Sequence, residues 1–154
     1  MEYVVVKWLH ILSSTFLFGT GIGSAWYMLF ANISRDVRAI AVVAKNVVIA
    51  DWLFTATTAV LQPATGFYMI HLAGYPLHSR WIMWSVILYV IAGACWLPVV
   101  WLQIRMRDLA VEAARANGAL PALYWRYFRI WATLGVPAFV AFIVIFWLMV
   151  AKPV

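Results

Sequence analysis

The chain has 154 residues, of which 67% are hydrophobic and 10% charged, and its mean hydropathy is +0.94. This composition excludes a soluble globular protein and indicates an integral membrane protein. The net charge of +6 does not indicate a nucleic-acid partner, because the cations lie at the ends of hydrophobic runs, and the single cysteine excludes an intramolecular disulfide or a cysteine metal cluster.

Hydrophobic runs divide the chain into segments long enough to cross a bilayer, which takes about 20 mainly apolar residues. They lie at roughly 8–31, 47–72, 81–104 and 130–151. The first run is too long for a signal-peptide core and has no small-residue cleavage pattern, so we expect it to remain as a helix. We predict an all-α polytopic membrane protein, with residues 1–154 forming one antiparallel bundle of four transmembrane helices.

The first run opens with Lys7 and His10, which share one helical face because they are three residues apart. Small and polar residues continue this stripe, and we expect it to face the inside of the bundle. Gly19 and Gly23 form a GxxxG motif, which permits close approach of another helix.

The second run carries the only acidic residue that lies inside a predicted span, Asp51. It begins a stripe of polar residues at three- and four-residue steps, namely Asp51, Thr55, Thr58, Gln62 and Thr65. Because ionisable residues inside a membrane are costly, the first four of these are a candidate proton or substrate route from the cytoplasmic side. Alternatively, Asp51 forms a structural ion pair with Lys45 or Arg38, and the threonines bond to their own helix.

The ends of the predicted helices are marked by capping residues and prolines. Ser34 is the predicted N-cap of the second helix, and Pro63 is expected to kink it. The third helix is expected to continue past the bilayer as a charged segment until Gly118 caps it. Pro121 suits the first turn of the fourth helix.

The cations are unevenly distributed among the connections, which predicts an orientation. Most of them lie in or beside the first and third connections: Arg35, Arg38, Lys45, Arg105, Arg107, Arg115, Arg126 and Arg129. By the positive-inside rule these connections are cytoplasmic. We therefore expect a multi-pass protein of the bacterial inner membrane with both termini outside, in the periplasm.

The three histidines are expected at the outer membrane face. His10 begins the first span, His71 ends the second at a similar depth, and His78 lies in the short loop that follows. Imidazoles at matched depth on neighbouring helices can hold a haem, and Lys7 can pair with a propionate. We predict His10 and His71 as iron ligands and Lys7 as a further cofactor-binding residue.

Two observations leave the ligand set open. On an ideal helix His71 lies about 180° away from the polar stripe, so the kink at Pro63 has to re-aim it. Otherwise His10 is ligated by His78, by a non-histidine residue, or by none, and the histidines are interface residues that bond to carbonyls or water. Met69, His71 and His78 are also ligand types that suit copper. Hydrolase and nucleotide-binding motifs are absent from the sequence.

Several segments resemble those of a bacterial integral-membrane family whose function is unknown, and the resemblance covers nearly the whole chain. They are residues 7–14 (KWLHILSS), 50–54 (ADWLF), 71–76 (HLAGYP) and 93–103 (GACWLPVVWLQ). More distantly, the Lys7-x-x-His10 opening resembles the HemJ-type protoporphyrinogen oxidases and the CopD-type copper-resistance membrane proteins. The first resemblance implies haem b bound through His10 and an oxidoreductase activity, and the second implies copper handling.

Together these features predict a haem b-binding membrane protein that transfers electrons to an acceptor such as quinone or oxygen, with a redox protein as partner. They do not identify which residues would be catalytic. The alternatives are a non-catalytic membrane subunit or scaffold, with homo-oligomer formation left open, and a copper-handling membrane protein.

Overall fold

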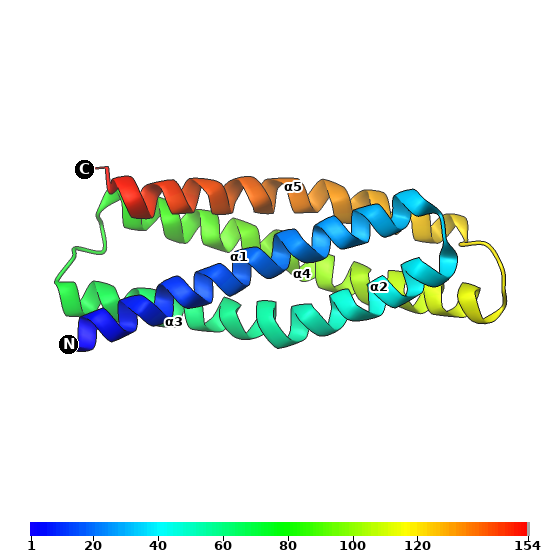
Figure 1. The fold of residues 1–154 in the computed structure, drawn as a ribbon. Coiled ribbons are helices and arrows are strands. Elements are labelled where there is room, and N and C mark those ends of the chain that lie inside the picture. Colours follow the sequence, from blue (N-terminus) through cyan, green and yellow to red (C-terminus); the bar gives the residue numbers. More distant parts are fainter. Residues whose placement is uncertain (154) are drawn as a thin grey trace.

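The computed structural model describes residues 1–153 as a set of long antiparallel helices (Figure 1). The elements are α1 (Glu2–Ser34), α2 (Val37–Ala50), the π-helix η1 (Asp51–Thr55), α3 (Ala56–Ala73), α4 (Arg80–Arg115) and α5 (Ala122–Ala151). Because α2, η1 and α3 are continuous, the described residues contain four helical segments that are long and apolar enough to cross a membrane. The predicted all-α, four-span fold is confirmed.

The connection between α1 and α2 is a tight turn that Asp36 stabilises. Its carboxylate accepts hydrogen bonds from the backbone N–H groups of Arg38 and Ala39, at 2.9 and 3.2 Å. The predicted N-cap, Ser34, is wrong by two residues, because its hydroxyl donates back to the Ala31 carbonyl and it is the last residue of α1. Because Ser34 still belongs to α1, the first free backbone N–H groups of α2 lie beside Asp36 instead.

The charged extension of α4 is confirmed, and the helix continues to Arg115. The left-handed residue that follows is Asn117, with φ of 50°, and not the predicted Gly118. The amide of Gly118 still satisfies a carbonyl of the last turn, because it donates to the Ala113 oxygen at 2.9 Å. Pro121 directly precedes α5 as its N-cap, one residue before the first turn.

The best-packed part of the bundle lies where α2 is enclosed by α1 and α4. Its fully buried side chains are Met28, Ile40, Met106 and Tyr124, which come from α1, α2, α4 and α5. Ala44 and Ala110 line the contact between α2 and α4, and their small side chains let the two backbones approach closely. This core fixes the ends of all four spans at the α1–α2 turn.

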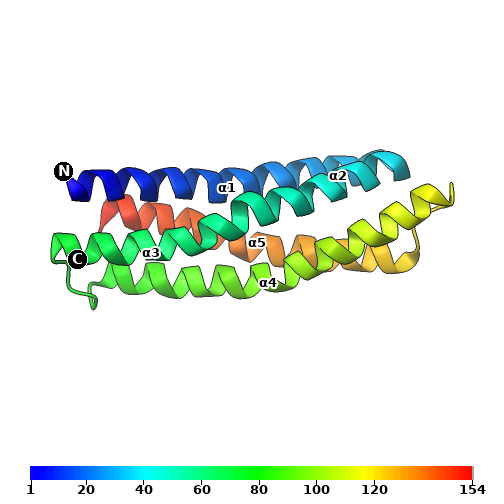
Figure 2. The ribbon, with the colours of Figure 1, turned by 90° about the horizontal axis from the view of Figure 1, so that it is seen from below.

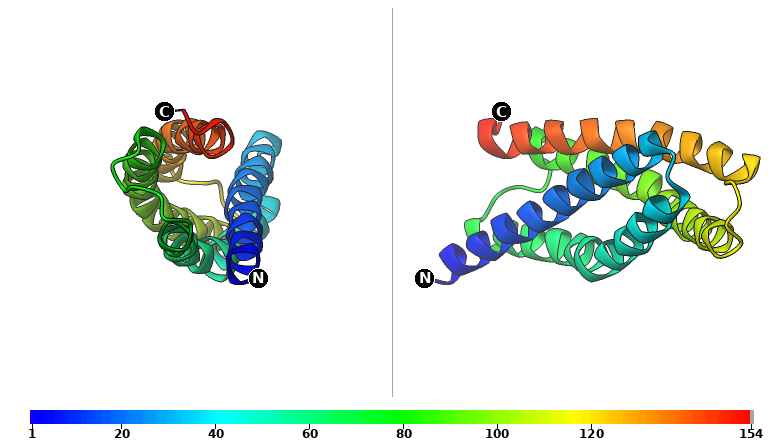
Figure 3. Two further views of the ribbon diagram at one scale, coloured as in Figure 1. Left: turned by 90° about the vertical axis from the view of Figure 1, so that its left-hand side faces the viewer. Right: turned by 45° about the vertical axis from the view of Figure 1, so that its right-hand side comes forward.

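The other half of the bundle consists of two helix pairs, α1 with α3 and α4 with α5, and the view along the bundle shows these pairs facing each other (Figure 3). Aromatic side chains fill the space between them. The ring of Phe18 in α1 lies 5.7 Å from Phe139 and 5.0 Å from Phe146 in α5, measured between centroids. Tyr89 of α4 donates to the Ala59 carbonyl of α3 at 2.7 Å.

The irregular backbone of the second span lies at η1, where the N–H of Ala56 bonds to the Asp51 carbonyl five residues earlier. Helices α2 and α3 run in different directions on either side of this turn (Figure 2). Pro63, which the sequence marks as the kink, lies inside α3. No proline or glycine occurs in residues 51–55, so sequence pattern did not predict the π-helix.

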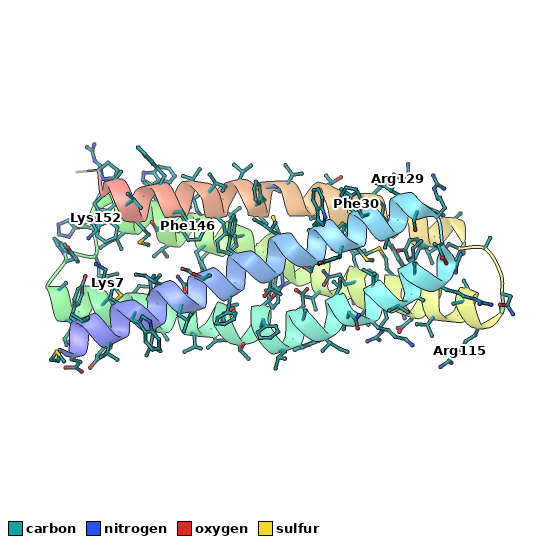
Figure 4. All side chains as sticks on the ribbon, viewed as in Figure 1. Lys7, Phe30, Arg115, Arg129, Phe146 and Lys152 are labelled. Carbon is teal, nitrogen blue, oxygen red and sulfur yellow. The ribbon has the colours of Figure 1, made fainter. Side chains whose placement is uncertain are left out.

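Both termini lie at one end of the bundle, together with the α3–α4 connection (Figure 1). Lys152, which directly follows α5, is held there because its ammonium lies over the rings of Tyr75 and Trp81, 5.0 and 5.5 Å from their centroids. Most arginines lie toward the opposite end, where Arg115 and Arg129 are visible (Figure 4). The helix arrangement fits the charge asymmetry, while the orientation in the membrane stays a prediction.

Cysteine labelling checks this orientation. In a Cys95→Ala background, Leu77→Cys reports on the α3–α4 connection and Ala116→Cys on the α4–α5 connection. We expect a membrane-impermeant maleimide to label the first variant in intact cells and the second only after permeabilisation, since the arginine-rich end faces the cytoplasm. The reverse pattern would show that the termini are cytoplasmic.

Candidate functional site

His10 is the histidine that the structure draws into the bundle. It is half-buried on α1 and faces α3, where both ring nitrogens have partners. Nδ1 lies 2.8 Å from the Thr65 hydroxyl, and Nε2 lies 3.1 Å from the side-chain nitrogen of Gln62. The hydroxyl of the buried Ser13 donates to the Gln62 side-chain oxygen, so the four residues form one polar cluster.

The partners of His10 define which nitrogen carries the proton. The Thr65 hydroxyl donates its hydrogen to the Leu61 carbonyl at 2.7 Å, so its oxygen accepts from His10 Nδ1. The Gln62 amide nitrogen can only donate, so His10 Nε2 accepts. With the Gln62 amide in this orientation, both bonds are satisfied by the tautomer with hydrogen on Nδ1, which directs the lone pair of Nε2 toward Gln62.

The imidazole of His10 rests directly on the backbone of α3. A Cβ atom on Gly66 would lie 3.2 Å from Cε1 of His10, which is tighter than an ordinary van der Waals contact. A glycine at this position therefore lets the ring approach the helix, and the contact fixes the plane of the ring together with Thr65.

A second polar group surrounds Asp51 at the π-helix. Asp51, Thr55 and Gln103 are 4%, 5% and 4% exposed, and the Thr55 hydroxyl donates to the Asp51 carboxylate at 2.9 Å. The Gln103 side chain of α4 lies close to this carboxylate. Asp51 is the one buried acid among the described residues 1–153.

The alternative that Asp51 forms a structural ion pair is wrong. Lys45 is exposed, and Arg38 donates instead to the Asn117 side chain at 2.8 Å, beyond the end of α4. The one salt bridge within residues 1–153 joins the neighbours Arg107 and Asp108. The physical reason is that residue 51 faces α4 and its glutamine, whereas residue 45 lies on the outer face of α2.

The remaining predicted residues of the polar stripe line the second span at its contact with α1. Thr58 is buried and donates to the Phe54 carbonyl at 2.5 Å, and Gln62 reaches His10 and Ser13 as described. The stripe thus joins the buried group at Asp51 to the half-buried cluster at His10, along one face of η1 and α3.

The structure does not bring His71, His78 or Lys7 into this cluster. All three side chains are exposed. His71 follows Gly66 by five residues, which turns it about 140° away from the face that holds His10. Within residues 1–153 no three histidine, cysteine, aspartate or glutamate side chains are grouped as a metal site would require.

Sequence reasoning missed four members of the two polar groups as site residues, namely Ser13, Thr65, Gly66 and Gln103. A signal existed for two of them, because Ser13 lies one helical turn from His10 and Thr65 belongs to the same stripe as Gln62. Gly66 and Gln103 could not have been found, since their roles depend on which helices become neighbours.

The fold and these polar groups define a polytopic integral membrane protein with a polar face inside the bundle. Residues 4–153 match the family model described as a predicted integral membrane protein, DUF2269, and the chain belongs to this family. The predicted resemblance to an integral-membrane family of unknown function is therefore confirmed, while the more distant resemblances stay predictions. No curated protein and no solved structure matches the chain.

Two matched threonine substitutions measure the His10 contact. Thr65→Val removes the acceptor of His10 Nδ1, whereas Thr57→Val removes an exposed hydroxyl that bonds only to carbonyls of its own helix. We expect Thr65→Val to lower the free energy of unfolding by about 0.5–1.5 kcal/mol relative to Thr57→Val. Equal denaturation midpoints in detergent for the two variants would contradict the contact.

Proposed function

We propose that this protein is a membrane-embedded redox protein that holds one haem b near its outer face, with His10 as an axial ligand. In this proposal it passes electrons from a membrane or periplasmic donor to an acceptor such as quinone or oxygen. The observation that supports it is the orientation of His10, because a histidine that ligates a metal through Nε2 usually donates its Nδ1 hydrogen to a fixed partner.

His10 would hold such a group through Nε2, and the residues around it would fix its ring. Thr65 fixes the tautomer, and Gly66 lets the ring lie against the α3 backbone. In the structure the Gln62 amide occupies the lone pair of Nε2, so this side chain has to turn aside for iron to bind. Bound haem would supply reversible one-electron chemistry between ferric and ferrous iron.

Lys7 is the residue that we propose for a propionate. It lies one turn outward from His10 on α1, is exposed, and has no salt bridge among the described residues. A charge-assisted bond at the membrane interface would hold a carboxylate there while the ring enters the bilayer. Since His71 faces away from His10, our proposal rests on His10 alone.

The polar stripe of the second span supplies the proposed proton route. Reduction of quinone or oxygen consumes protons, and Asp51, Thr55, Thr58 and Gln62 provide hydroxyl, amide and carboxylate groups from the arginine-rich end toward His10. Asp51, Thr55 and Thr58 are buried and Gln62 is half-buried, so these groups are largely kept from lipid and stay available to each other or to water.

The test is the haem content of the detergent-purified protein, expressed with ample haem and measured as the pyridine haemochrome. We expect a Soret band and, after dithionite reduction, sharp α and β bands. His10→Ala is expected to lose the haem, whereas His78→Ala in the exposed loop keeps it. Thr65→Val is expected to retain the protein ligand but lower haem affinity about 10–100-fold.

Two results would overturn the assignment. A colourless native protein would remove the haem proposal, and a His10→Ala variant with full haem content would exclude His10 as the ligand. His71→Ala decides whether a second histidine contributes, because a change from low-spin to high-spin absorption in that variant would restore His71 as the second ligand.

A second candidate function, a non-catalytic membrane subunit, is favoured by the open glycine face of α1. A Cβ atom at Gly19, Gly21 or Gly23 would meet nothing within 4 Å, so the GxxxG motif is not used for packing inside this chain. Such a face suits close approach of a helix from another protein or from a second copy.

Gly19→Leu with Gly23→Leu tests this second candidate. Because a Cβ atom at either position meets nothing in the chain, we expect the fold to be retained but a co-purifying partner, or oligomers in light scattering, to be lost. Gly135→Leu on α5, which is equally open, serves as the control. Unchanged association in the double variant would contradict the role of this face.

A further inference from the structure

The carboxylate of Asp51 is buried in the bundle without a cation to balance it. It is 4% exposed, and no lysine or arginine within the described residues forms a salt bridge with it. An uncompensated anion in a membrane interior is costly, so such a group takes up a proton or a cation. A proton or a cation is therefore needed to neutralise the charge of Asp51 in the folded protein.

Gln103 provides an independent observation at the same place. Its side chain is 4% exposed and lies close to the Asp51 carboxylate, and its own oxygen Oε1 is buried without a hydrogen-bond partner. A buried amide oxygen that accepts no hydrogen bond lowers the stability of the folded state. The Gln62 amide, by contrast, is hydrogen-bonded at both ends. Rotating the Gln103 amide by 180° exchanges the positions of its nitrogen and Oε1 with almost no change in the shape of the side chain.

The backbone is also irregular where the carboxylate lies. Asp51 is the first residue of η1 and Thr55 the last, and the hydrogen bond from Ala56 to the Asp51 carbonyl interrupts the regular α-helical ladder. Single π-turns inside α-helices are frequent at functional sites. Interrupted membrane helices, with carbonyl and side-chain oxygens at the break, hold monovalent cations in transporters.

We propose that Asp51, Thr55 and Gln103 form a binding site for a sodium ion between η1 and α4. The ligands would be the Asp51 carboxylate, the Thr55 hydroxyl oxygen and the Gln103 oxygen Oε1. All are hard oxygen donors, and together they carry a single negative charge, which suits a monovalent cation. The proposal does not depend on His10 or on any haem.

The choice of cation follows from charge and ligand type. A calcium ion takes 6–8 oxygen ligands, commonly with several carboxylates, and only one carboxylate is buried here. Copper and zinc prefer nitrogen and sulfur, which no residue of the site supplies as a ligand. Protons compete for the same carboxylate, so a proton-only site is the alternative that the experiment has to exclude.

The experiment is thermal denaturation of the full-length protein in detergent at constant ionic strength, with sodium chloride replacing choline chloride. Because a ligand that binds only the folded state stabilises it as RT ln(1 + [Na⁺]/Kd), we expect the midpoint to rise steadily with sodium concentration. Potassium chloride in a third series shows whether the site selects the smaller ion.

Asp51→Asn is the test variant, and Asp108→Asn, which alters an exposed carboxylate on α4, is its matched control. We expect the sodium response to vanish in the first and persist in the second. Gln103→Leu keeps the carboxylate but removes Oε1. We expect this variant to need at least a tenfold higher sodium concentration for the same rise in the denaturation midpoint. An absent response in the native protein, or an equal response in Asp51→Asn, would overturn the proposal.

Discussion

Polar side chains inside a bilayer have to find their partners within the protein, and this constraint explains how α1 packs on α3. The ring of His10 and the amide of Gln62 satisfy each other, while Ser13 and Thr65 bond to the outer atoms of the same pair. Lipid tails are as apolar as leucine, so hydrophobic burial does little to hold two membrane helices together. The polar contact therefore determines which faces of these helices meet.

The two halves of the bundle are built on different principles. Around α2, alanines and compact apolar side chains such as Ile40 and Met106 bring backbones close together and form a dense core. In the other half, the aromatic rings of Phe18 and Phe142 meet across the two helix pairs, and Tyr89 packs against Phe142. The His10 cluster lies in this half, between α1 and α3.

The sequence predicts much of this architecture because membrane helices have strong signals. Length and hydropathy located the four spans, and the three- and four-residue spacing of the polar residues correctly placed Thr55 and Thr58 on an inward face. Capping residues and prolines located the ends of the second, third and fourth helical segments to within a few residues, whereas α1 begins six residues before its predicted span. Ser34 and Asp36 are both good capping residues, and only the geometry of the turn decides between them.

Features that depend on tertiary neighbours could not be predicted in the same way. Spacing alone placed His10 and His71 at a similar depth. It did not show that His10 of α1 contacts one face of α3 while His71 is exposed on another face of that helix. The pairing of Asp51 with Gln103 joins residues that are distant in sequence. The π-helix has no composition signal, because its hydrogen bonds are set by how α2 and α3 pack against different partners.

The π-helix also has a consequence for the register of the second span. A π-turn accommodates one residue more than an α-helical turn, so it behaves as a one-residue insertion into an otherwise regular helix. If the five residues Asp51–Thr55 were wound as a regular α-helix with none removed, all of α3 would rotate by about 100° relative to α2. Gln62 and Thr65 would then leave His10. The orientation of α3 relative to α2 thus depends on how the backbone is wound in a single turn.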